Sequence, residues 1–122
     1  MLYQYLIQRN SEIGMIGSRP FLFDTTVAYN SLRRSKAGYK RVAKLHGFYE
    51  SNVGCPVVIG DKGTFKISKT VNGRRFEVAN EIVESTHIVA ISHVKGHIRA
   101  GFGGPIKNFG MGGVTKESKR DA

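Results

Sequence analysis

The glycine-rich stretch from residue 93 to residue 113 constrains this chain more than any other segment. It holds seven of the 15 glycines in the sequence. Glycine loses more backbone entropy on folding than any other residue, so ordered structures keep it where the backbone needs a positive φ or a close approach. An apolar run at residues 88–92 precedes the stretch and predicts a buried strand. Because ligands of open α/β sheets bind beyond the carboxyl ends of strands, the stretch is a candidate ligand site.

The order of the expected elements favours an α/β fold. Helical periodicity or capping signals occur at residues 2–13, 36–45 and 81–84, with Ser35 placed to cap the second helix and Asn80 the third. The expected buried face of the second helix consists of Tyr39, Val42, Ala43 and Leu45. Short apolar runs that predict strands occur at residues 20–26, 56–59 and 86–92. Strands that alternate with helices predict a mixed, largely parallel sheet with flanking helices.

Residues 64–79 predict an antiparallel β-hairpin appended to that sheet. Phe65 and Ile67 alternate with polar residues, and the alternation resumes over residues 75–78. Between the two runs, Asn72-Gly73 is the signal of a type I′ turn. The strict alternation indicates that one face of the hairpin is solvated.

The length of 122 residues predicts a single α/β domain spanning residues 1–122. Residues 114–122 are short and charged, and we expect them to form a frayed tail. No run reaches the ~18 apolar residues that span a membrane, and the N-terminal residues lack the features of a signal peptide. We therefore expect a cytoplasmic protein with no membrane partner, in which exposed sheet edges favour a homo-oligomer.

Cys55 is the only cysteine, so it forms no internal disulfide and cannot hold an iron–sulfur cluster alone. Its position between Gly54 and Pro56, just before an apolar run, predicts a small buried residue at the start of a strand. A reactive thiol is the alternative.

The formal net charge of +10 suggests an anionic partner. No helix-turn-helix, RNA-recognition or zinc-finger signature accompanies the basic residues. They fall into small clusters at residues 33–36, 40–44, 74–75 and 116–120. A solvated basic surface is therefore the expectation, and a phosphate-bearing small ligand or a nucleic acid are the alternatives.

The glycine-rich stretch has the composition of an anion site, although it contains neither a Walker loop nor a GxGxxG motif. Its glycines allow successive backbone N–H groups to converge on an anion, and a helix beginning at Pro105 would add its dipole. A tight structural turn with a surface lysine is the alternative. The expected ligand-binding residues are Lys95, Gly101, Gly103, Gly104, Lys107 and Asn108.

Two further polar groups are candidates for chemistry. His93, Lys95 and His97 alternate, so on an extended backbone they face the same way. His93 and His97 could then bind a metal or transfer protons, whereas one core-capping and one exposed histidine is the alternative. Asp24, followed by two threonines at the end of the first strand, could bind a hydroxyl group, a metal or the histidine loop, or could simply cap a turn.

Four segments resemble, in order, the family catalogued as domain of unknown function 362. They are residues 19–29, 37–48, 55–61 and, as the most specific, residues 91–112. Many members continue into a ferredoxin-like segment that binds iron–sulfur clusters. This chain lacks those cysteine runs, and Gly113 stands where members often carry cysteine. The resemblance therefore implies a fragment or shortened form of a larger family domain, without an iron–sulfur cluster of its own.

The pattern formed by His97, Gly101, Phe102, Gly104 and Lys107 is similar to a segment of the lactate racemase family, which uses a nickel-pincer nucleotide. This similarity implies a proton-transfer role for His97 and a cofactor- or anion-anchoring role for Lys107. The function that we expect is a small-molecule, cofactor- or anion-binding α/β domain within a redox or proton-transfer enzyme. A basic nucleic-acid-binding module and an inactive truncated remnant are the alternatives.

Overall fold

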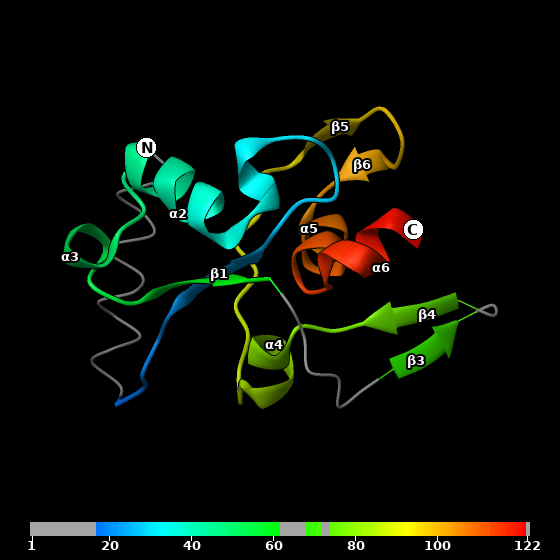
Figure 1. Cartoon of the computed structure of the whole chain (residues 1–122). Helices are drawn as coiled ribbons and strands as arrows, with labels where there is room; N and C mark the ends of the chain where they lie inside the picture. The colour runs from blue at the N-terminus through cyan, green and yellow to red at the C-terminus, as the bar shows by residue number, and fades with distance from the viewer. Residues whose placement is uncertain (1–16, 62–67, 72–73, 122) are drawn as a thin grey trace.

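The computed structural model describes residues 17–61, 68–71 and 74–121, and it has the predicted mixed α/β architecture (Figure 1). Strands β1 (Leu22–Thr25) and β2 (Val57–Gly60) form a small parallel sheet, in which Leu22 pairs with Val57 and Thr25 with Gly60. Among the described residues this sheet has only these two strands. It is therefore smaller than the sequence predicted.

Helices connect the two parallel strands, because a parallel pair needs a crossover connection. The crossover consists of the 3-10 helix η1 (Leu32–Arg34), α2 (Lys36–Leu45) and α3 (Glu50–Val53). The predicted helix and its cap are confirmed, since Ser35 Oγ accepts a hydrogen bond from the Gly38 N–H at 3.1 Å. Leu45, which the periodicity placed on the buried face, is 78% exposed because α2 ends there and the chain turns at Gly47 with φ +85°.

The apolar core is small. Val53, Cys55 and Ile59 are buried where α3 leads into β2, so the buried position predicted for Cys55 is confirmed. Ala43 is the buried residue of α2. In the described part of the chain, no helix is long and apolar enough to cross a membrane.

The predicted antiparallel hairpin is confirmed as strands β3 (Ser68–Val71) and β4 (Arg74–Glu77), with Ser68 opposite Glu77. It forms a separate two-stranded sheet and does not extend the parallel one. The turn at Asn72-Gly73, the alternating residues 65–67 and the predicted helix over residues 2–13 lie outside the described residues.

The strand predicted over residues 86–92 is wrong. Helix α4 (Asn80–Glu84) forms as expected, although Ala79 rather than Asn80 is its N-cap, and the chain then runs to residue 94 with no strand. Ile88 is 46% exposed and Val89 69% exposed. An apolar run becomes a strand only where a neighbouring strand satisfies its backbone N–H and C=O groups, and no described strand pairs with this segment.

The C-terminal part is more ordered than predicted. Strands β5 (Lys95–His97) and β6 (Gly101–Gly103) form a short antiparallel hairpin, which is followed by α5 (Pro105–Gly112) and α6 (Lys116–Asp121). Pro105 occupies the first turn of α5, as expected.

The prediction of a frayed tail over residues 114–122 is wrong, because α6 docks against the end of β4. The Thr115 N–H donates to the Glu77 carbonyl oxygen at 2.9 Å, and the Glu77 N–H donates to Ser118 Oγ at 2.6 Å. Thr115 and Ser118 are both buried. Polar residues that sequence alone assigns to solvent are thus held by the backbone of a distant strand.

Candidate functional site

The carboxyl ends of β1 and β2 meet at one edge of the sheet and gather polar side chains there. We call Asp24, Thr25, Thr26, Asp61 and Lys119 the strand-end cluster. Thr25 and Thr26 are buried, and Thr26 Oγ1 donates to Asp61 Oδ1 at 3.2 Å. Lys116 of α6 forms an ion pair with the same Asp61 oxygen at 3.8 Å. The cluster therefore joins both strand ends to the C-terminal helix.

Asp24 is held from several directions within this cluster. Its Oδ1 accepts the Thr25 N–H at 2.8 Å, and its Oδ2 accepts the Tyr39 hydroxyl at 2.5 Å. Burial raises the pKa of Tyr39, and the hydrogen bond to Asp24 and its negative charge raise it further, against an opposing effect of Arg33. Tyr39 is therefore a protonated donor to this carboxylate near neutral pH.

Asp24 also meets the glycine-rich stretch, but at the far end of α5 from the histidine loop. A Cβ at Gly112 would lie 3.3 Å from Asp24 Oδ1. Thr25 Oγ1 donates to the Gly112 carbonyl oxygen at 3.0 Å. The structure thus brings together two segments that the sequence singled out separately, through Gly112 rather than through His97.

Lys119 of α6 binds the end of β1 within the strand-end cluster. Its Nζ lies 2.5 Å from Thr25 Oγ1, 2.8 Å from the Thr26 carbonyl oxygen and 3.3 Å from the Thr25 carbonyl oxygen. Burial lowers the pKa of Lys119, the charge of Asp24 opposes this shift and the charge of Arg33 adds to it. All three donors of the ammonium group are thus directed to protein oxygens.

The β5–β6 hairpin presents a different surface, which we call the glycine face and define by Lys95, His97 and Gly103. In the hairpin Lys95 pairs with Gly103, and His97 pairs with Gly101, whose φ of +68° favours glycine at the turn. A Cβ at Gly103 would lie 3.4 Å from Lys95 Cγ and 3.7 Å from His97 Cβ. Lys95 and His97 therefore project on the same side, as the alternation predicted, and both pack close to the buried Gly103.

The ring of His97 is oriented by its own turn. His97 Nδ1 accepts the Ala100 N–H at 3.1 Å and the Arg99 N–H at 3.3 Å. A neutral imidazole held in this way carries its proton on Nε2. The nitrogen that remains for a ligand is therefore a hydrogen-bond donor.

Helix α5 begins directly beside the glycine face. Gly104 is its N-cap and supplies no side-chain cap, and a Cβ there would lie only 2.4 Å from the ring of Phe102. Lys107, in the first turn, is half-buried, and its side chain makes no hydrogen bond or ion pair with the described residues. Asn108 Nδ2 donates to Ser92 Oγ at 3.1 Å, so this amide ties α5 to the segment before β5.

His93 lies outside the hairpin, in the exposed segment that precedes β5. In the described ranges, no group of three or more histidine, cysteine, aspartate or glutamate side chains is arranged to hold a metal ion. The metal site predicted from His93 and His97 stays a prediction.

Residues 6–122 match the family described as Domain of unknown function (DUF362). The chain belongs to this family. The resemblance inferred from the four sequence segments is thereby confirmed. No curated protein matches the chain, and no solved structure matches it.

Sequence reasoning missed Tyr39 and Lys119 in this DUF362 chain. Tyr39 was assigned only to the buried face of a helix, and Lys119 to a frayed tail. A signal for α6 was nevertheless present, because Glu117 lies in its first turn and Lys119 and Arg120 in its last. This order of charges complements the helix dipole. No local pattern indicated that the Lys119 side chain would reach β1.

Proposed function

We propose that this chain binds a small ligand or cofactor through its phosphate or carboxylate group on the glycine face. The observation that carries the proposal is that Lys95 and His97 project on the same side of β5, beside Gly103, which contributes no side chain there. An ammonium group and an imidazole N–H on the same side of a strand can both donate hydrogen bonds to one small anion.

The start of α5 adds to this attraction. Gly104 and Pro105 follow β6 without an intervening loop, so the first turn of the helix lies next to the glycine face. The first N–H groups of a helix have no partner within it, and its dipole favours negative charge there. Lys107 in that turn supplies a further positive charge. We assign it the role of anchoring the anionic group.

The wider context that we propose is a redox or proton-transfer enzyme. The local similarity of residues 97–107 to lactate racemases supports this context and assigns chemistry to His97 and Lys107. With Nδ1 engaged by two backbone N–H groups, His97 would donate from Nε2 to a ligand oxygen. Donation to an oxygen, rather than removal of a proton, is therefore the part of the reaction that this arrangement favours.

The first test is native mass spectrometry of the purified chain together with metal analysis, before any denaturing step. We expect a bound anionic adduct that is absent from His97→Ala and from Lys107→Ala, while the melting temperature of both variants stays near that of the wild type. Lys36→Ala is the matched control, because this lysine is exposed on α2. Equal occupancy of all four proteins would contradict the proposal.

A second variant separates the shape of the site from its charge. Gly103→Val keeps every cationic group but places a branched side chain against Lys95 and His97. We expect it to abolish binding of the adduct, or of inorganic phosphate and pyrophosphate followed by NMR titration. Valine suits a strand, so the hairpin itself should persist. Unchanged binding by Gly103→Val would place the anion elsewhere.

A further inference from the structure

The crossover between β1 and β2 contains a long stretch without negative charge. No aspartate or glutamate occurs between Asp24 and Glu50, whereas this interval holds six lysine and arginine residues. Three of them, Lys36, Lys40 and Lys44, recur every fourth residue along α2, and all three are exposed. Residues four apart lie on the same side of a helix. We call these three residues the lysine stripe.

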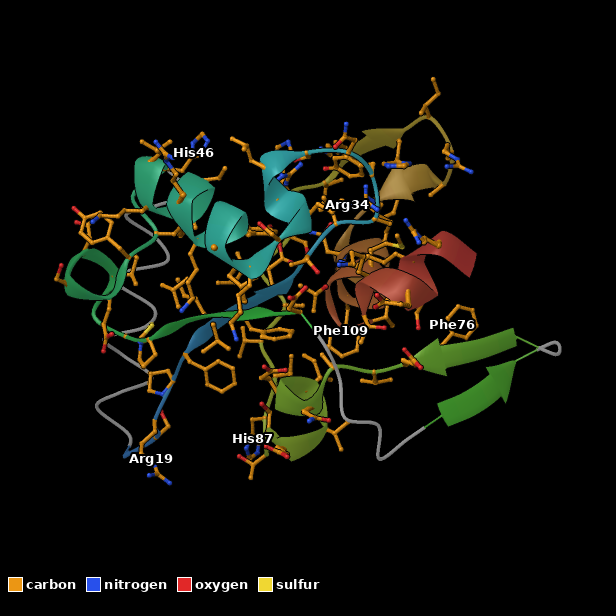
Figure 2. All side chains as sticks on the ribbon, viewed as in Figure 1. Arg19, Arg34, His46, Phe76, His87 and Phe109 are labelled. Atoms are coloured by element: carbon orange, nitrogen blue, oxygen red, sulfur yellow. The ribbon has the colours of Figure 1, made fainter. Side chains whose placement is uncertain are left out.

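The fold extends the stripe into one basic surface. Arg41 is exposed on α2, and η1 packs against the same helix with Arg34 exposed. In Figure 2, Arg34 and His46 mark the opposite ends of this η1–α2 layer. Two basic clusters that are separate in the sequence thus lie along one edge of the molecule.

The lysine stripe opposes the stability of its own helix. Like charges four residues apart on a helix repel each other and destabilise it. Lys36 also places positive charge in the first turn, where the helix dipole favours negative charge. Within the described ranges, the ion pair between side chains is that of Lys116 with Asp61, so no acidic residue there neutralises the stripe. Its charge is therefore available to an external partner.

We infer that the lysine stripe binds the phosphate backbone of a nucleic acid. The stripe is straight and rigid, and eight residues of helix extend it over about 12 Å. Contacts of this kind position a protein on a nucleic acid without reading its sequence, and a duplex presents about one negative charge per 1.7 Å of its axis. The absence of a sequence-reading motif is consistent with such binding.

The apolar residues of α2 favour this partner over a membrane surface. Tyr39, Val42 and Ala43, which lie between the ends of the stripe, are buried or half-buried, so none of them is available to insert into lipid. Leu32 and Leu45 are exposed, but they lie outside the stripe at its two ends. Because the large apolar side chains between the ends of the stripe are buried or half-buried, the stripe also lacks the apolar and aromatic anchors in which the energy of a protein interface is concentrated.

The test measures the binding of a fluorescein-labelled DNA duplex, and of a single-stranded RNA, by fluorescence anisotropy over a series of salt concentrations. The affinity of the wild-type chain should fall linearly with salt on logarithmic axes. In the double variant Lys40→Gln/Lys44→Gln, the plot of log affinity against log salt should be less steep by about 1.8, because each phosphate contact contributes about 0.9 to the slope. Glutamine has nearly the helix propensity of lysine, so α2 should remain intact, as circular dichroism can verify.

The matched control is Arg19→Gln/Arg120→Gln, which removes the same net charge from exposed positions outside α2. Figure 2 shows Arg19 at the opposite side of the molecule from His46 and Arg34. This control should keep the wild-type slope, and Lys107→Ala should do so too, which separates the stripe from the glycine face. An equal reduction of the slope in both double variants would overturn the inference. So would the absence of nucleic-acid binding at low salt, or binding to phosphatidylserine vesicles without binding to nucleic acid.

Discussion

The strand-end cluster and the glycine face each combine a lysine with polar groups and glycine backbone, yet they differ in whether those groups have partners. Lys119 is half-buried and directs three donors to oxygens of Thr25 and Thr26. The side chain of Lys95 is exposed and makes no hydrogen bond with the described residues. Polar groups that are hydrogen-bonded within the protein contribute to folding, whereas polar groups without a partner remain available to a ligand. We therefore expect the cluster to govern stability and the glycine face to govern binding.

The largest effect should follow removal of the Lys119 ammonium. Lys119→Ala deletes the link between α6 and β1 and leaves the carbonyl oxygens of Thr25 and Thr26 without this donor. Because hydrogen bonds to charged groups are among the stronger ones, the free energy of unfolding should fall by roughly 2–3 kcal/mol. Urea denaturation followed by circular dichroism measures the change.

Lys107→Ala is the counterpart of this variant on the side of the glycine face. Since the Lys107 side chain has no partner among the described residues, the free energy of unfolding should stay within about 0.5 kcal/mol of wild type. Similar losses in the two lysine variants would erase the distinction between the two regions.

An intermediate effect is expected from Tyr39→Phe, which removes the hydroxyl donor to Asp24. The loss should be about 1.5 kcal/mol at neutral pH. Because the pKa of Tyr39 is raised above its ordinary value of 10.0, the unfolded chain loses this proton at a lower pH than the folded chain. The contribution of Tyr39 is therefore complete below pH 10 and decreases as the pH rises beyond it.

Urea titrations of the wild type and of Tyr39→Phe at neutral and strongly alkaline pH measure this contribution. The difference in unfolding free energy between the two proteins should shrink as the pH rises above 10.0, the ordinary tyrosine value. A difference that stays constant over the alkaline range would show that burial and Asp24 do not hold the tyrosine proton.

The smallest effect compares two glycines of the same helix. A Cβ at Gly110 would meet nothing within 4 Å, whereas one at Gly112 would lie 3.3 Å from Asp24 Oδ1. Alanine is better than glycine inside a helix by up to about 1 kcal/mol, so Gly110→Ala should raise the melting temperature. The contact with Asp24 should cancel that gain in Gly112→Ala. Equal stabilisation of both variants would mean that the strand-end cluster is looser than its hydrogen bonds indicate.

Local patterns in the sequence were sufficient for several elements. The Ser35 cap, the alternation beyond Gly73 and the proline at position 105 each act within a few residues, and α2, β4 and α5 all formed where these signals placed them. The alternation of Lys95 and His97 also predicted their common side, because side-chain direction in a strand depends only on the local backbone.

Elements that depend on distant partners were predicted wrongly. The apolar residues 86–92 lack a described strand beside them and stay exposed, while the charged tail becomes α6 because Glu77 of β4 binds its backbone and Ser118. Neither outcome can be derived from a local window. The pairing of backbone groups is decided by which segments meet after folding.

The sequence by itself determined the family, the α/β class and the two segments in which polar chemistry gathers, because composition, turn signals and motif order are local properties. Only the tertiary structure decided which region has a lysine whose ammonium group is already hydrogen-bonded to protein oxygens. Lys119 reaches from α6 to Thr25 at the end of β1, whereas the side chain of Lys95 is exposed and has no hydrogen-bonding partner among the described residues. The tertiary structure also placed the basic clusters of η1 and α2 on one surface. Lys119 and Thr25 lie far apart in the chain, so no local pattern in the sequence could predict their contact.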